Sequence, residues 1–104
     1  MKFEAIAVLA DPKRRTILGT LLKTDLCVGE VCSATGIAQP SVSKHLKVLR
    51  EAGFVSRRTA SGRQIYSLDA NAFMELDAWL EPYRQLWTKH LDALEVHLDR
   101  EEKK

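Results

Sequence analysis

The chain has 104 residues, 45% hydrophobic and 29% charged, with a formal net charge of +2. This length and composition predict one compact domain and exclude a multidomain enzyme. The sequence has no apolar run of ~18 residues and no signal-peptide pattern, which predicts a cytoplasmic protein that does not enter membranes. Residues 1–68 carry eleven basic and five acidic side chains, whereas residues 69–104 carry five and nine, so the N-terminal part is expected to bind a polyanion.

The N-terminal part of the chain has the pattern of two short helices. In the first helix, apolar residues recur at helical spacing at Phe3, Ile6 and Leu9. Asp11 is a capping residue and Pro12 suits the first helical position, so a second helix is predicted from Pro12 to about Lys23. Its expected inward residues are Ile17, Leu18, Leu21 and Leu22. Three cations at residues 13–15 oppose the helix dipole, and a neighbouring phosphate is one explanation for them.

Two further short helices are predicted next, joined by a tight turn. The first covers Val28–Thr35 and ends at Gly36, which can adopt left-handed geometry. The second begins with a proline and covers residues 40–52, so the pair forms a helix-turn-helix. The apolar period then changes to about two, which predicts a β-hairpin over residues 54–68 with its turn at residues 60–62.

From Asp69 the chain is expected to return to helix almost to its end. Apolar residues step by three and four along one face, and they are Phe73, Leu76, Leu80, Tyr83, Trp87, Leu91, Leu94 and Leu98. Pro82 predicts a kink or a break near residues 79–81. Because the stripe exceeds what a small core needs, we interpret it with the first helix as a dimer interface; packing within one chain is the alternative. The predicted interface residues are Phe3, Ile6, Leu9, Leu80, Tyr83, Trp87, Leu91 and Leu94.

The helix over residues 40–52 has a small, polar and cationic face opposite its apolar one. Short hydroxyls let a backbone approach closely, amide and imidazole groups bond base edges, and lysines contact phosphate, so this face suits the major groove of DNA. The hairpin arginines would reach the flanking backbone or the minor groove. The predicted DNA contacts are Gln39, Ser41, Ser43, Lys44, His45, Lys47, Arg57, Arg58 and Arg63. For His45 and Lys47, an ordinary packing or surface role fits the sequence about equally well.

Four segments carry a family pattern: residues 10–18, 26–31, 39–55 and 62–68. Together they resemble the ArsR/SmtB family of bacterial transcriptional repressors, most specifically through the run Gln-Pro-Ser-Val-Ser-Lys-His-Leu that starts at Gln39. The resemblance implies a winged helix-turn-helix, mainly α-helical with a small β-hairpin wing, that dimerises through its first and last helices. It also implies a repressor, often of its own promoter, bound to an inverted-repeat operator in double-stranded DNA. We expect a single domain over residues 1–104, with a DNA-binding core at 12–68, a wing at 54–68 and dimerisation helices at 1–11 and 69–100.

Cys27 and Cys32 are the only candidate metal ligands that the resemblance suggests. The family's arsenite pattern is Cys-Val-Cys-x-x-Cys, and Gly29 stands here in place of the middle thiol. Trivalent arsenic prefers three thiolates, and positions five apart lie about 140° apart around a regular helix. We therefore favour structural roles for both thiols, with a metalloid- or redox-responsive repressor as the alternative.

No other part of the sequence points to a cofactor or to catalysis. His90 and His97 lack the pair motifs of the family's zinc site, so no metal is expected there. No nucleophile, carboxylate pair or nucleotide loop has a plausible pocket around it, and an enzyme is not expected. A winged-helix module that binds protein is a distant alternative. Such a module would not need the cluster of basic residues formed by Lys44, Lys47, Arg57, Arg58 and Arg63. The sequence does not identify an inducer.

Overall fold

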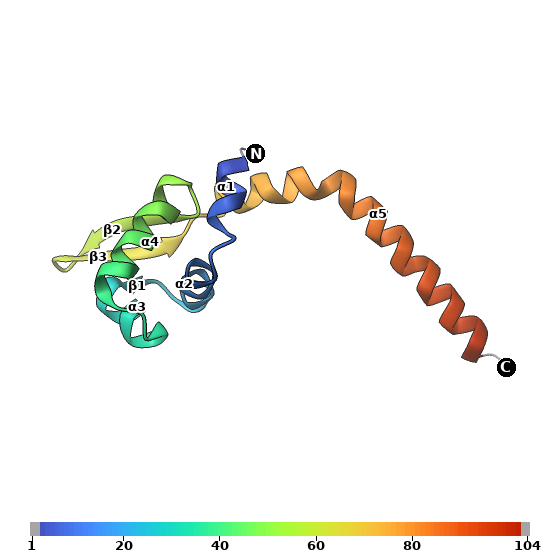
Figure 1. Cartoon of the computed structure of the whole chain (residues 1–104), viewed down its shortest axis with the longest axis horizontal. Coiled ribbons are helices and arrows are strands. Elements are labelled where there is room, and N and C mark those ends of the chain that lie inside the picture. Colours follow the sequence, from blue (N-terminus) through green and yellow to red (C-terminus); the bar gives the residue numbers. More distant parts are fainter. Residues whose placement is uncertain (1–2, 103–104) are drawn as a thin grey trace.

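The computed structural model describes residues 3–102, and the side chains of residues 4–95 (Figure 1). Its elements in chain order are α1 (Phe3–Val8), α2 (Pro12–Lys23), β1 (Leu26–Cys27), α3 (Val28–Thr35), α4 (Gln39–Glu51), β2 (Val55–Ala60), β3 (Arg63–Leu68) and α5 (Ala70–Glu102). Helices α2, α3 and α4 pack together beside an antiparallel sheet in the order β1-β3-β2. This is the predicted helix-turn-helix with a wing, although the two-residue strand β1 was not expected.

The predicted capping signals operate at the helix ends. The Asp11 carboxylate accepts hydrogen bonds from the backbone N–H groups of Lys13 and Arg14, at 2.8 and 3.2 Å, and starts α2. Desolvation alone would raise the pKa of this carboxyl, but these two bonds outweigh it and the pKa lies below its ordinary value. Helix α3 ends at Gly36, whose φ of 74° is left-handed and whose N–H donates to the Cys32 carbonyl at 2.9 Å.

The wing is a regular two-stranded hairpin. Ala60 pairs with Arg63, so β2 extends one residue further than predicted and the turn consists of Ser61 and Gly62 alone. Both turn residues have positive φ values, 52° and 76°, as a type I′ turn requires. Strand β1 pairs with the other edge of β3 and ties the wing to the helices.

The core lies between the three packed helices and the base of the wing. Its buried apolar side chains are Ile17, Leu18, Leu21, Val31, Val42, Leu46, Leu49, Phe54, Val55, Tyr66 and Ala72. Phe54 is fully buried and meets Phe73 edge to face at 5.0 Å, which anchors the start of α5. The prediction for Leu22 is wrong: it is 76% exposed. It lies on the flank of α2, where it lines an open apolar groove with Leu68 and Phe73.

Helix α5 continues through Pro82, so the predicted break is wrong. The helix instead changes direction along its length, as Figure 1 shows, which agrees with the predicted kink. Arg84 spans this region, pairing with the carboxylate and carbonyl oxygen of Asp77 and with the Glu81 carboxylate at 3.0 Å. No helix in the described part of the chain is long and apolar enough to cross a bilayer.

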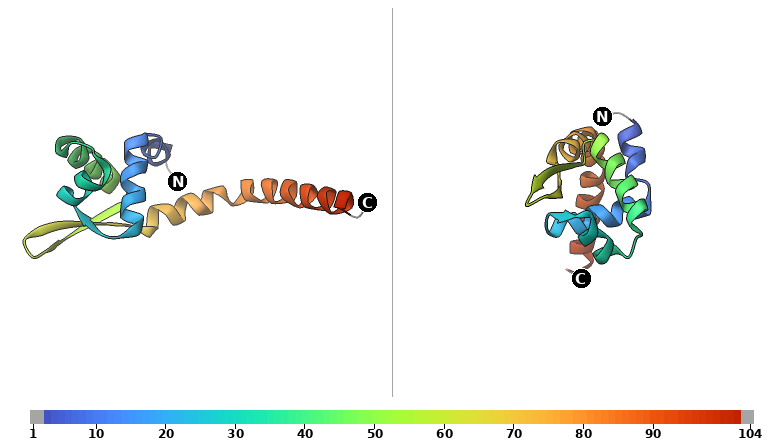
Figure 2. Two further views of the ribbon diagram at one scale, coloured as in Figure 1. Left: turned by 90° about the horizontal axis from the view of Figure 1, so that it is seen from below. Right: turned by 90° about the vertical axis from the view of Figure 1, so that its left-hand side faces the viewer.

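Figure 2 shows the distal part of α5 running alone, away from the helices and the wing. The molecule is therefore elongated, with extents of 64 × 29 × 23 Å.

Candidate nucleic-acid interface

Helix α4 has one buried face and one exposed polar face. Val42, Leu46 and Leu49 are fully buried. The exposed side chains that were predicted to contact DNA are Gln39, Ser43, Lys44 and Lys47, and Ser41 is half-buried beside them. Residues 31–68 contain six basic side chains and one acidic side chain, Glu51. The outward face of α4 thus carries positive charge beside short hydrogen-bonding groups, as major-groove recognition requires.

His45 has the surroundings of the packing role that the sequence left open beside a base contact. Only 9% of the residue is exposed, and its Nδ1 atom accepts a hydrogen bond from Nε of Arg14 at 3.2 Å. The Nδ1 atom is thus engaged by an element of the same chain and is not free to bond a base edge. The residue lies between the two faces of α4, and its contact with α2 buries it. Its burial and its bond to Arg14 favour the packing role over a base contact.

The wing presents two of its three arginines to solvent without an ion pair among the described residues. Arg57 and Arg63 are these two. Arg58 lies on the opposite face of β2 from Arg57, and its guanidinium is 3.0 Å from the Asp25 carboxylate and 3.4 Å from the Ser67 hydroxyl. Arg58 is thus the wing arginine with an ion-pair partner among the described residues, and because its side chain is 56% exposed its predicted contact with DNA stays a prediction.

Two of the three cations in the first turn of α2, Arg14 and Arg15, have side-chain partners within the chain. Arg14 donates to the Val8 carbonyl at 3.2 Å, and Arg15 donates to the carbonyls of Leu9 and Ala10 at 3.1 and 2.8 Å. These carbonyls belong to the last residue of α1 and to the two residues after it, where helix carbonyls have no partner within the helix. Capping of α1 therefore accounts for both arginines without a phosphate. Sequence reasoning missed this role because the acceptors belong to a different helix.

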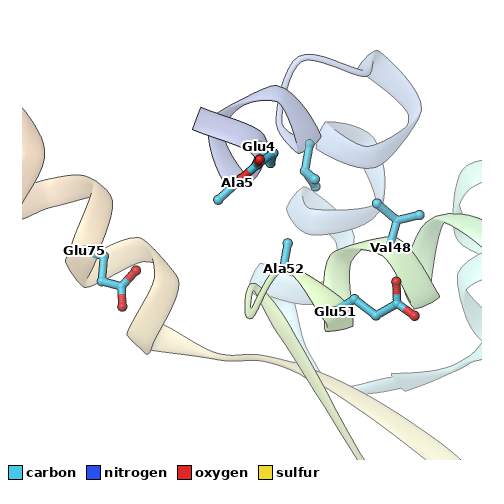
Figure 3. A pocket seen from close by; sticks show the side chains of 7 residues that line it. Glu4, Ala5, Val48, Glu51, Ala52 and Glu75 are labelled. Atoms are coloured by element: carbon cyan, nitrogen blue, oxygen red, sulfur yellow. The ribbon is translucent and has the colours of Figure 1, made fainter. Parts of the chain in front are cut away.

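Acidic residues gather at the C-terminal end of α4. Glu51 of α4, Glu4 of α1 and Glu75 of α5 surround a cavity whose wall includes Val48 and Ala52 (Figure 3). Negative charge repels phosphate, so this end is unsuited to nucleic acid. The surface that suits a polyanion is therefore the beginning and the outward face of α4 together with the wing.

The predicted interface residues of α5 are exposed to solvent in the single chain. Tyr83 is 50% exposed, Trp87 44%, Leu91 59% and Leu94 47%, while Leu80 is half-buried. Ile6 of α1 and Leu9, which follows α1, are also half-buried, and Leu9 packs against the core. The side chain of Phe3 lies outside the described residues. The distal part of α5 thus presents apolar surface that its own chain does not cover.

The two thiols belong to different elements. Cys27 ends strand β1 and caps α3, and its N–H donates to the Glu30 carboxylate at 3.0 Å. This hydrogen bond is the main reason that the pKa of the Glu30 carboxyl lies below its ordinary value. Cys32 lies within α3 and packs against the core. Within the described residues, no three His, Cys, Asp or Glu side chains are grouped to hold a metal ion. His90 is exposed, and the side chain of His97 lies outside the described part.

Comparison with known proteins places this arrangement in a family. Residues 11–57, from the cap of α2 into β2, match the model of the bacterial regulatory proteins of the arsR family. The chain is 37% identical over 93 residues to the HTH-type transcriptional regulator Rv2034 of Mycobacterium tuberculosis, which covers 89% of this chain and 84% of that protein. The chain belongs to the ArsR family. It is therefore a DNA-binding transcriptional regulator, as the sequence predicted.

Two further ArsR-related proteins extend the comparison. The transcriptional repressor SdpR of Bacillus subtilis is 31% identical over 72 residues, covering 69% of this chain and 80% of that protein. The solution structure of the homodimeric winged helix-turn-helix DNA-binding domain of Mb0332 from Mycobacterium bovis is 25% identical, with a TM-score of 0.64. That match covers 84% of this chain and 81% of the other. The winged helix-turn-helix fold predicted from the sequence is confirmed.

Proposed function

We propose that this ArsR-family protein is a homodimeric repressor that binds an inverted-repeat operator, often at its own promoter. In this proposal, α4 of each protomer enters a major groove and each wing contacts the flanking backbone or minor groove. Helices α1 and α5 join the two protomers. The chain acts by occupying DNA, and the proposal gives it no catalytic role.

The observation that carries the proposal is the outward face of α4. Lys44 and Lys47 are exposed, have no ion-pair partner in the described part of the chain, and share the outward face of α4 with the exposed Ser43. Arg57 and Arg63 of the wing add two more unpaired cations. A module that binds protein through its winged helix would not need unpaired cations on both the recognition helix and the wing.

The apolar side of α5 supports the dimer. Tyr83, Trp87, Leu91 and Leu94 recur at intervals of three and four residues, and each is 44–59% exposed in one chain. A two-fold partner that supplies the same stripe would cover both copies at once. The homodimeric state of the Mycobacterium bovis domain supports this arrangement for a chain of the same fold.

The test measures affinity for DNA against salt. A duplex selected from a random library by the protein itself, followed by fluorescence anisotropy, gives both the sequence preference and the affinity. Four cations in each protomer give about eight phosphate contacts, so log K should fall with log salt at a slope of about −7, or about 10⁴-fold between 50 and 200 mM. A flat salt dependence with no sequence preference would reject the operator-binding role.

The two thiols give the same assay a second use. Repeating it with arsenite under reducing conditions should leave the affinity unchanged, because Cys27 and Cys32 belong to different elements and lack a third thiol. Release of DNA by arsenite would instead support the metalloid-responsive alternative. Replacing both cysteines with serine would then identify whether they are the ligands.

A further inference from the structure

Arg14 makes hydrogen bonds to two helices other than its own. It lies in the first turn of α2, and its Nε donates to Nδ1 of His45 in α4 at 3.2 Å. Its Nη1 donates to the carbonyl of Val8, the last residue of α1, also at 3.2 Å. A single planar guanidinium thus joins α1, α2 and α4.

This contact is of a different kind from the others that hold α4. Val42, Leu46 and Leu49 pack α4 on the core through apolar contacts, which resist separation but are weakly directional. Among the side chains described, at residues 4–95, His45 is the one residue of α4 whose side chain makes a hydrogen bond to another element. Hydrogen bonds weaken steeply away from their preferred angle, so this bond restricts rotation of α4 about its axis.

The neighbouring residue Arg15 shows that capping α1 and contacting α4 are two separate roles. It donates to the carbonyls of Leu9 and Ala10, so it caps the end of α1 just as Arg14 does. It makes no bond to α4 among the described residues. The two neighbouring arginines therefore share one role and differ in the other.

We propose that Arg14 is a positioning residue that couples the dimerisation helix α1 to the recognition helix α4. The inference rests on the proposed function, in which α1 lies in the dimer interface and α4 reads DNA. Dimer formation orders the end of α1, and the Val8 carbonyl then fixes the position of the Arg14 guanidinium. The guanidinium in turn fixes His45, which sets the rotation of α4 about its axis. Assembly of the dimer thus orients the helix that reads the operator.

The first experiment compares matched variants on the selected operator. Arg14→Lys keeps the positive charge but removes the planar guanidinium that donates to α1 and α4 at the same time. Arg15→Lys makes the same chemical change at a residue that does not contact α4. Arg14→Lys should weaken operator binding about tenfold, which corresponds to one lost hydrogen bond to a charged group, and Arg15→Lys should change it less than about twofold. His45→Gln, which retains an acceptor, should bind more tightly than His45→Leu. Equal losses in the two lysine variants would overturn the proposal.

The second experiment needs no DNA. The ¹⁵N resonance of His45 Nδ1, assigned with the His45→Gln variant, reports whether this nitrogen accepts a hydrogen bond. Dilution from dimer to monomer should shift the resonance in the wild type and leave it unmoved in Arg14→Lys. A wild-type His45 resonance that does not shift on dilution would overturn the coupling. A wild type that shows the shift but binds no DNA would instead support the coupling and reject the operator-binding function.

Discussion

Truncating Leu91 tests the proposed dimer directly. Leu91 is 59% exposed in the single chain. Fully burying a leucine side chain contributes about 1.5–3 kcal/mol, so covering the exposed part contributes about 1–2 kcal/mol per copy. The two-fold axis places two copies in one interface, so Leu91→Ala should weaken dimerisation by about 2–4 kcal/mol. At about 1.4 kcal/mol per factor of ten, this is a rise in the dimer Kd of about 30- to 800-fold.

Sedimentation equilibrium measures this change, with Gln85→Ala as the matched control. Gln85 is exposed on the opposite side of α5, and glutamine and leucine have nearly the same helix propensity. The control variant should therefore keep the wild-type dimer Kd. Far-UV circular dichroism at high concentration checks that both variants are folded. A Leu91→Ala protein that dimerises as tightly as the wild type would refute the assignment of this face to the interface.

Three further predictions concern the DNA surface and the stability of the fold. Lys44→Ala should weaken binding on every sequence and reduce the salt slope by about two in the dimer, whereas Gln39→Ala should relax base preference in a selection experiment and leave the slope alone. Because folding lowers the pKa of Asp11, its carboxylate stabilises the fold above the ordinary value of 3.8, and this stabilisation is lost as the pH falls through the lowered value. Asp11→Asn should therefore lower Tm at pH 7, and the deficit should shrink as the pH drops below 3.8; an unchanged deficit would assign the effect to the cap geometry alone. Phe54→Ala should cost about 3–5 kcal/mol in urea unfolding, since its fully buried ring also anchors α5 through Phe73; a smaller loss would mean that the site collapses around the cavity.

Local signals explain why the elements were predictable. Pro12 and Pro40 at helix starts and Gly36 at a helix end act within one turn of the chain, so their consequences can be read from neighbouring residues. Apolar spacing likewise identified the buried face of α4. Strand β1 was missed because two residues carry no period, and its pairing with β3 is a long-range contact.

The partners of two predicted site residues could not be found from the sequence. His45 and Arg58 are bonded to Arg14 and Asp25, which lie 31 and 33 residues away in the sequence. Helical periodicity assigns a residue at the edge of a face only approximately, and the neighbouring element decides whether it is covered. The same reasoning applies to Leu22, whose exposure depends on how the start of α5, at Phe73, packs beside α2. Residues at the centre of a face, such as Lys44, were assigned without this ambiguity.

The unpartnered distal part of α5 has a consequence for gene control. An isolated helical segment gains little stability in water, so this part depends on a second copy for most of its order. If both half-sites must be filled by one dimer, then well below the dimer Kd the occupied fraction of the operator rises with the square of the monomer concentration. A promoter under such control switches off over a narrower range of protein levels than one that binds a monomer. In this chain, the apolar length of α5 that each protomer leaves uncovered sets the dimer Kd, and therefore the protein concentration below which this steep response holds.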